Sequence, residues 1–187
     1  VFLGMLGDKE TAVIEMASAS GIELLKPEER NPIRTTSYGT GELIRKALDH
    51  YCSRIILGVG GSATIDGGAG MLAALGVKFL NRKQKPLLPA GGNLDQITQL
   101  NTDGLDPRLE KMQIKIGTDV NNPLTGKNGA ASVYGPQKGA NPQEIRILER
   151  NLTGYAELLE KCSGKNLKAL PGSGAAGGLA ISLLAFT

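Results

Sequence analysis

A glycine-rich tract at residues 58–76, reading GVGGSATIDGGAGMLAALG, constrains this chain more than any other segment. Seven glycines lie there among Ser62, Thr64 and Asp66. Glycine has no Cβ, so its backbone can approach a ligand closely and adopt positive φ angles that other residues avoid. We therefore expect this tract to bind a phosphate or a carboxylate.

Composition excludes several classes of protein. The chain has 187 residues, of which 41% are hydrophobic, enough for one sizeable core. Its 21 basic and 18 acidic residues give a net charge of +3, too even for a nucleic-acid surface. No apolar run is long enough to span a membrane. We expect a soluble globular protein that binds neither nucleic acid nor membrane.

Histidine and cysteine are too scarce for most metal sites. The only histidine is His50, and Cys52 and Cys162 lie far apart at no metal-binding spacing. Reduced thiols of this kind favour a cytoplasmic protein. Carboxylate and amide oxygens remain as ligands, and these suit Mg²⁺.

Strand and helix patterns alternate along the chain and predict an α/β fold. Residues 2–6 and 11–16 read as a hairpin around Gly7-Asp8-Lys9-Glu10. A helix is predicted over 41–51 with Thr40 as its N-cap. The next elements are a buried strand at 54–59, a small-residue helix at 67–75 that ends at Gly76, and a strand at 77–80. This order predicts a right-handed crossover with parallel pairing.

Two further elements follow in the second half. Alternation over 112–118 predicts a strand with one wet face. Asn141, Pro142 and Glu144 form a capping-box signature for a long helix that Gly164 ends. We expect a mixed, partly parallel sheet with flanking helices.

Four polar, glycine-rich segments interrupt this pattern, at residues 36–42, 58–70, 117–140 and 171–178. Loops at the carboxyl ends of parallel strands line the ligand crevice of α/β folds, and two of these segments follow predicted strands. The 24 residues of 117–140 exceed an ordinary connection. We expect a functional site where these loops meet.

A dinucleotide-binding turn is one interpretation of the tract, because Gly58, Gly60 and Ala63 match G-x-G-x-x-A after a strand. The acidic residue that should follow the next strand is absent, since Asn81 and Arg82 stand there. An NADP-dependent oxidoreductase using Arg82 remains an alternative.

Longer motifs carry a family resemblance. GTGELIRKAL, ILGVGGSATIDGGAGMLAALGVKF, TDVNNPLTGKNGAASVYGPQKGA and GSGAAGGL follow one another at the order and spacing of the bacterial type I glycerate kinases. The chain resembles this family over essentially all of its length. The resemblance implies a two-domain α/β kinase about twice as long, of which residues 1–187 are a single α/β unit, the central domain. The amino-terminal and carboxyl-terminal parts of the other domain would lie outside this sequence, which starts without Met and stops inside an apolar run.

The resemblance further implies a reaction: transfer of the γ-phosphoryl group of ATP to D-glycerate, with Mg²⁺ and with 2-phosphoglycerate as the favoured product. The candidate residues are Gly60, Gly61, Ser62 and Thr64 for phosphate or substrate, Asp66 and Asp119 for the metal and the hydroxyl proton, Lys127 and Lys138 as counter-charges, and Asn121 and Asn122 as polar ligands. In the full-length enzyme, we expect Asp66→Asn and Asp119→Asn each to lower turnover at least about a hundredfold and to leave the melting temperature nearly unchanged.

Each candidate has a structural alternative. Asp66 would cap the helix that begins at Gly67, Asp119 would brace its own loop, and Lys127 and Lys138 would be solvated. A non-catalytic ligand-binding module is a third functional class beside the kinase and the oxidoreductase. A homo-oligomer is left open by the sequence.

Overall fold

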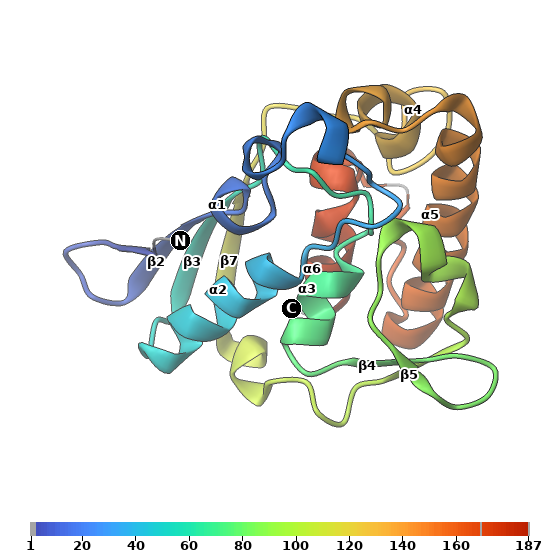
Figure 1. The fold of residues 1–187 in the computed structure, drawn as a ribbon. Helices are drawn as coiled ribbons and strands as arrows, with labels where there is room; N and C mark the ends of the chain where they lie inside the picture. The colour runs from blue at the N-terminus through green and yellow to red at the C-terminus, as the bar shows by residue number, and fades with distance from the viewer. Residues whose placement is uncertain (1–2, 169, 187) are drawn as a thin grey trace.

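The computed structural model describes residues 3–168 and 170–186 (Figure 1). Its main sheet has the order β1 (Gly4–Met5), β2 (Thr11–Glu15), β3 (Arg54–Gly58), β7 (Gln113–Gly117). The pairs β2–β3 and β3–β7 are parallel, whereas β1 and β2 form the antiparallel hairpin that the sequence predicts. The α/β class with a mixed, partly parallel sheet is therefore confirmed.

The register of this sheet separates a buried face from an open one. Ile14, Leu57 and Ile116 are aligned across the three parallel strands, and Ile14 and Leu57 are fully buried. Side chains alternate between faces along a strand, so the neighbouring row, Ile56 and Lys115, points the other way. Ile56 is 39% exposed. Helix α2 (Tyr38–Asp49) packs against the buried face through its apolar stripe.

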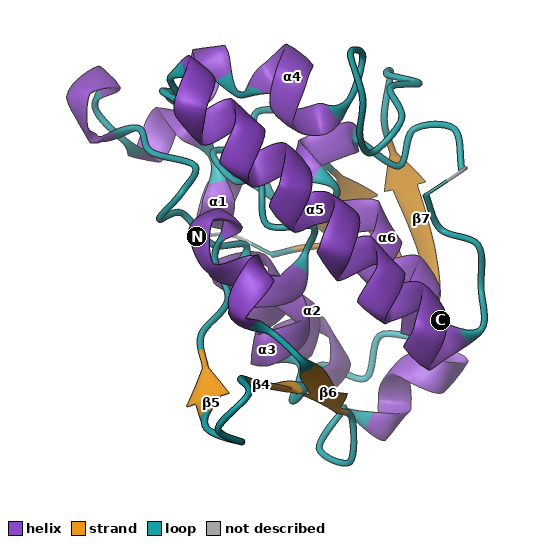
Figure 2. Cartoon of the chain, turned by 90° about the vertical axis from the view of Figure 1, so that its right-hand side faces the viewer, coloured by secondary structure: helices purple, strands orange, loops and turns teal. Residues whose placement is uncertain are grey.

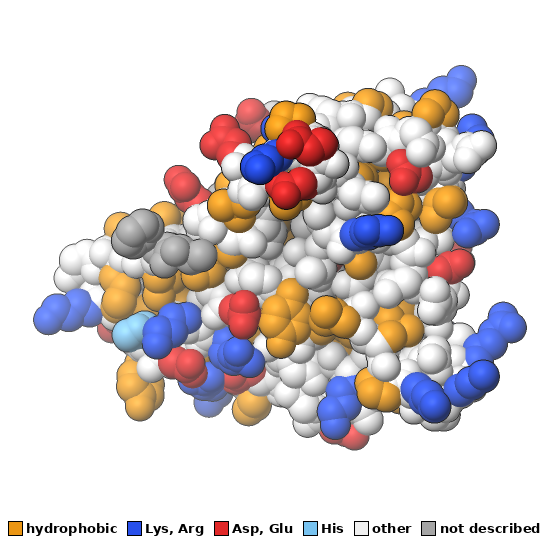
Figure 3. Space-filling view, in the orientation of Figure 1, with side chains coloured by type: hydrophobic (Ala, Val, Ile, Leu, Met, Phe, Trp, Pro, Cys, Tyr) orange, Lys and Arg blue, Asp and Glu red, His pale blue; other side chains and the backbone are white. Residues whose placement is uncertain are grey.

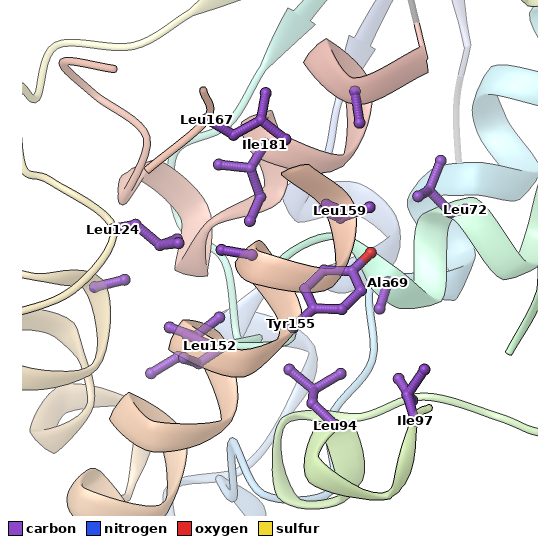
Figure 4. Packing of buried hydrophobic residues seen from close by; sticks show 14 of the residues in the cluster. Ala69, Leu72, Leu94, Ile97, Leu124, Leu152, Tyr155, Leu159, Leu167 and Ile181 are labelled. Atoms are coloured by element: carbon purple, nitrogen blue, oxygen red, sulfur yellow. The ribbon is translucent and has the colours of Figure 1, made fainter. Parts of the chain in front are cut away.

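Helices α3 (Ala69–Ala74) and α6 (Leu179–Phe186) occupy the middle of the molecule, between the sheet and the long helix α5 (Pro142–Ser163) (Figure 1). Each of the two middle helices contributes side chains to both hydrophobic clusters of the core. A helix that is buried on most sides is apolar nearly all round, which explains the sequence LAISLLAF of α6, where Leu184 is the exposed position. Figure 4 shows the cluster on the α5 side, where Tyr155 lies beside Ala69 of α3.

Helix α5 forms as its sequence predicts. Asn141 is the N-cap, and its side chain accepts hydrogen bonds from the N–H groups of Gln143 and Glu144, while the Glu144 carboxylate accepts one from the N–H of Asn141. The helix ends at Gly164, whose φ of +70° places it in the left-handed region. Both boundaries depend on local chemistry alone, so sequence was sufficient to find them.

The prediction for the start of α2 was wrong. Helix α2 begins at Tyr38 with Ser37 as its N-cap residue, three positions before the expected cap at Thr40. Thr40 is instead fully buried inside the helix, where its Oγ1 lies 2.9 Å from Ser20 Oγ. A tertiary hydrogen bond thus satisfies the hydroxyl that the pattern assigned to a cap.

The predicted parallel crossover from β3 to residues 77–80 was also wrong. Strand β4 (Lys78–Leu80) belongs to a separate antiparallel sheet with β5 (Pro86–Leu87) and β6 (Gln99–Asn101), at the bottom of Figure 2. Val77 and Phe79 bury their side chains in the α5 cluster, with the Phe79 and Tyr155 ring centroids 6.2 Å apart. Strand β4 therefore packs against α5 and does not join the main sheet, whose third parallel strand is β7.

Short helical segments connect these elements. They are α1 (Ala17–Ser20), η1 (Ile22–Leu24), η2 (Pro27–Glu29), η3 (Gly91–Gln96), η4 (Pro107–Lys111), α4 (Ala130–Tyr134), η5 (Pro136–Lys138) and η6 (Ala175–Gly177). Among residues 3–168 and 170–186, no helix is long and apolar enough to cross a membrane. Figure 3 shows acidic and basic side chains interspersed over one face, with neither sign covering it.

Candidate active site

A pocket of about 580 Å³ lies beyond the carboxyl ends of β3 and β7, at the upper end of the sheet in Figure 1. The N–H of Val59 donates to the carbonyl of Gly117 at 3.3 Å, which holds the two strand ends together there. The walls come from Val59, Gly60, Gly61 and Ser62, from Gly117, Thr118, Asp119 and Val120, from Tyr134, Gln137 and Lys138, from Ala175 and Ala176, and from Ile22. Three of the four glycine-rich segments therefore meet where a ligand crevice is expected.

The first half of the glycine tract faces this pocket. A Cβ added at Gly60 would meet no atom within 4 Å, and Gly61 has a φ of +68°. Among the described residues, no hydrogen bond is donated by the main-chain N–H of Gly60, Gly61 or Ser62. These three main-chain donors belong to residues that line the pocket, and they form a candidate cradle for an anionic group.

The second half of the tract serves packing. A Cβ at Gly67 would lie 2.7 Å from the Tyr155 ring, and one at Gly68 would lie 2.7 Å from the Leu179 carbonyl oxygen. At Gly70 the added carbon would lie 2.0 Å from Thr36 Oγ1. These glycines allow α3 to approach α5, α6 and the start of α2. Of the glycines in the tract, only Gly60 and Gly61 line the pocket, so the expected ligand contact stays a prediction for these two.

Lys138 lines the pocket and is buried. Its side chain is 3% exposed, and Nζ donates to Ser62 Oγ at 2.7 Å and to the Thr64 carbonyl oxygen at 2.8 Å. The position of Lys138 depends on the short helix η5, which turns back toward the tract after α4. Burial lowers the pKa of the Lys138 amino group to about 7, and the charge of Asp66 opposes that fall. The alternative that Lys138 is solvated is wrong.

Asp119 lines the same pocket with an exposed side chain. Its charge helps to raise the pKa of Tyr134, although desolvation of the phenol is the larger cause. The Tyr134 hydroxyl in turn donates to Asn122 Oδ1 at 2.7 Å, and Asn122 Nδ2 donates to the Asn128 carbonyl oxygen. Asn122 therefore stabilises the loop between β7 and α4 through these two hydrogen bonds. Asn121 and Lys127 are exposed and do not line the pocket.

Asp66 lies beneath the site, with none of its surface exposed. Its carboxylate accepts hydrogen bonds from Ser37 N–H and Oγ and from the N–H groups of Gly68 and Gly70, at 2.7–3.2 Å. Burial raises the pKa of the Asp66 carboxyl, and these donors oppose the rise. Asp66 is not the N-cap residue of α3, which is Gly68, but its hydrogen bonds join the segment that leads into α3 to Ser37 at the start of α2.

Thr64, which was predicted to bind phosphate or substrate, does not line the pocket. Thr64, which is 1% exposed, lines a smaller hollow of about 170 Å³, although its carbonyl oxygen accepts a hydrogen bond from Lys138.

Within the part of the chain that the structure describes, no group of three or more His, Cys, Asp or Glu side chains is arranged to hold a metal ion. Mg²⁺ is usually held by one or two carboxylates together with substrate phosphates, and Asp119 fits that pattern.

Sequence reasoning missed the residues at the η6 side of the pocket. Ala176 lines it with a φ of +52°, a conformation that residues with a side chain seldom adopt. A Cβ at the following Gly177 would lie 2.0 Å from the Thr64 carbonyl oxygen, so the loop packs directly on the tract. The glycine cluster at 171–178 indicated a loop of interest, but alanines carry no functional group that a pattern could single out.

Comparison with known proteins settles the family. The sequence model of the glycerate kinase family matches residues 1–187, the whole chain. The chain belongs to the glycerate kinase family. It is 50% identical over 183 residues to a glycerate kinase of Haemophilus influenzae and 49% identical over 183 residues to the glycerate 2-kinase of Escherichia coli, covering 98% of this chain in each case. It covers 48% of each of those two proteins, so the chain spans about half the length of these relatives.

A solved structure of the family has the same fold. The crystal structure of a protein assigned as glycerate kinase 2 from Salmonella typhimurium LT2 superposes with a TM-score of 0.96 at 48% identity. The match covers 99% of this chain and 50% of that one. The geometry gives no support to a dinucleotide-binding turn, because α3 begins only at Ala69, well after Gly60, and β4 is not the next strand of the parallel sheet.

Proposed function

We propose that the protein carrying this sequence transfers the γ-phosphoryl group of ATP to a hydroxyl of D-glycerate, with 2-phosphoglycerate as the favoured product. The names of its relatives, glycerate kinase and glycerate 2-kinase, support this reaction. The observation that carries it in the structure is the cradle of Gly60, Gly61 and Ser62 main-chain donors beside the Lys138 amino group. Both substrates are anions, and phosphoryl transfer depends on positioning them and balancing their charge.

In this proposal the main-chain N–H groups of Gly60, Gly61 and Ser62 bind a phosphate or the glycerate carboxylate. Lys138 supplies positive charge from the floor of the same pocket. Mg²⁺, when bound with the nucleotide, would neutralise charge on the phosphates. Asp119 is the carboxylate placed to hold it, since its side chain is exposed to the pocket.

Asp66 acts through the residues that it positions. Because its carboxylate ties the start of α3 to Ser37, it holds the chain that follows Gly60, Gly61 and Ser62 in place. Lys127, Asn121 and Asn122 lie outside the pocket wall, so we give them no direct contact with substrate in this proposal. We also propose that residues 1–187 form the central domain of a two-domain kinase and that the reaction takes place in the cytoplasm, where ATP is abundant.

A coupled assay of ADP release tests the proposal. The protein carrying this sequence, in its complete form, should release ADP from ATP and Mg²⁺ only when D-glycerate is present. Nuclear magnetic resonance of the product should then identify 2-phosphoglycerate. Binding of both substrates without ADP release would favour a non-catalytic ligand-binding module, and binding of NADPH in their place would favour the oxidoreductase.

A further inference from the structure

Lys138 is a buried lysine whose amino group donates to uncharged oxygens. Lysine is almost never fully buried unless it is paired, because a charge loses its hydration inside a protein. Within residues 3–168 and 170–186, no carboxylate lies within ion-pair distance of Lys138 Nζ. Its two acceptors, Ser62 Oγ and the Thr64 carbonyl oxygen, are both neutral.

The number of acceptors matches the uncharged form of the side chain. A neutral amine has two N–H groups, and the protein provides one acceptor for each. An ammonium group has three N–H groups, so one of them would lack a partner among the residues that the structure describes. Lys138 and its acceptor Ser62 both line the pocket, so we look for the acceptor of that third N–H in a ligand bound there.

The charged groups around Lys138 do not supply that acceptor. Asp66 favours the ammonium form through its charge, but its oxygens already accept hydrogen bonds from Ser37, Gly68 and Gly70. Asp119 and Tyr134 line the same pocket without a bond to Nζ, and the pKa of Tyr134 is raised, so its phenol is neutral near pH 7. Burial lowers the pKa of Lys138 to about 7. Near pH 7 the free protein is therefore a mixture of molecules with a neutral amine and molecules with an ammonium group at Lys138.

We propose that Lys138 forms an anion subsite that takes up one proton when a carboxylate or phosphate group of a substrate binds there. The proton comes from solvent and goes to Nζ, and the new N–H donates to the bound anion. No other bond forms or breaks. This inference rests on the proposed function, because D-glycerate and ATP are the sources of the carboxylate and the phosphate.

Linkage makes the affinity depend on pH. Below a pH of about 7, Lys138 is already charged in the free protein, and the anion binds with full affinity. Above that pH each binding event must also protonate Lys138, so the dissociation constant should rise by up to about tenfold per pH unit. An arginine at this position would stay charged throughout and remove the dependence.

Isothermal titration calorimetry in two cationic buffers of different ionisation enthalpy, Tris and triethanolamine at about pH 8, measures how many protons are taken up on binding. D-glycerate alone and ATP with Mg²⁺ alone are the two probes, titrated into the complete protein. We expect uptake of about one proton with one of them, which assigns the subsite to the carboxylate or to the phosphate. Lys138→Arg and Lys138→Met should abolish the uptake, with Arg keeping more affinity, and the matched surface change Lys127→Met should leave it unchanged.

Other results would overturn the inference. Binding of both probes without proton uptake would reject it and leave the proposed function standing, as would uptake that persists in Lys138→Met. If neither probe bound, the subsite and the proposed function would both be rejected. Should a variant fail to fold, the wild-type protein still decides, because a dissociation constant that stays flat between about pH 7 and 9 contradicts the linkage.

Discussion

Ser37 binds the carboxylate of Asp66 twice, through its main-chain N–H at 2.7 Å and through its Oγ at 2.8 Å. The same Oγ accepts the N–H of Met71, and Asp66 accepts those of Gly68 and Gly70. The starts of α2 and α3 therefore meet at one buried negative charge. Partial positive charge at helix N-termini favours such an anion.

Replacing Asp66 with Asn should lower stability. An amide keeps one acceptor oxygen and introduces a donor, so some of the four hydrogen bonds are lost, at roughly 1–3 kcal/mol for each donor left unpaired. Urea unfolding should show this loss, contrary to the sequence-based expectation of an unchanged melting temperature. Asp95→Asn is the matched control: its ion pair with Arg150 lies on the surface at 3.6 Å and should contribute less than about 1 kcal/mol. Equal stability of the two variants would contradict the buried role of Asp66.

Replacing Asp119 with Asn should lower turnover and leave stability unchanged. The side chain is exposed in the pocket, and a metal or proton-accepting role typically contributes about a hundredfold or more. The ADP-release assay with D-glycerate measures the loss, and thermal unfolding checks the fold. Asp103→Asn, an exposed aspartate away from the pocket, should retain wild-type turnover. Activity within a few-fold of wild type for Asp119→Asn would exclude it from the site.

The two halves of the glycine tract should respond differently to alanine. At Gly60 an added Cβ enters open space, so Gly60→Ala should change stability by less than about 0.5 kcal/mol while weakening substrate binding. At Gly68 the φ of +78° and the Leu179 carbonyl oxygen 2.7 Å from the added carbon make the same change unfavourable, at roughly 1–3 kcal/mol. Urea unfolding and calorimetric titration of the two variants test this contrast. A similar loss of stability in both would show that Gly60 also serves packing.

Lys138→Met should change how stability depends on pH. Burial lowers the pKa of Lys138 to about 7 in the folded protein, below its value of about 10.4 in the unfolded chain. Between these values the unfolded chain binds more protons at this residue, so the wild-type protein gains stability as pH rises, and the variant lacks that gain. Unfolding free energies from about pH 6 to 9 should therefore show wild type gaining relative to Lys138→Met above about pH 7. The unfolding free energy of Lys127→Met should depend on pH as that of the wild-type protein does. A difference in unfolding free energy between wild type and Lys138→Met that does not change with pH would contradict the lowered pKa.

Local sequence patterns predicted the elements whose boundaries depend on neighbouring residues. The Asn141 capping box and the left-handed Gly164 delimit α5 in the structure as they do in the sequence. The strands β2 and β3 were also found, as short apolar runs, and β7 was found from its alternation of apolar and polar residues. The strand that pairs with β3 was not predicted correctly. Whether β4 or β7 pairs with β3 depends on where Val77 and Phe79 bury their side chains.

The candidate site divides in the same way. Sequence alone determined that glycine, serine, aspartate and lysine gather in loops after parallel strands, and that this composition suits anionic ligands. Only the tertiary structure decided that Gly60, Gly61 and Lys138 face one pocket while Asp66, Gly67, Gly68 and Gly70 support it from below. The reason is physical: a residue's type sets which bonds it can make, whereas its burial and its partners depend on segments far away in the chain.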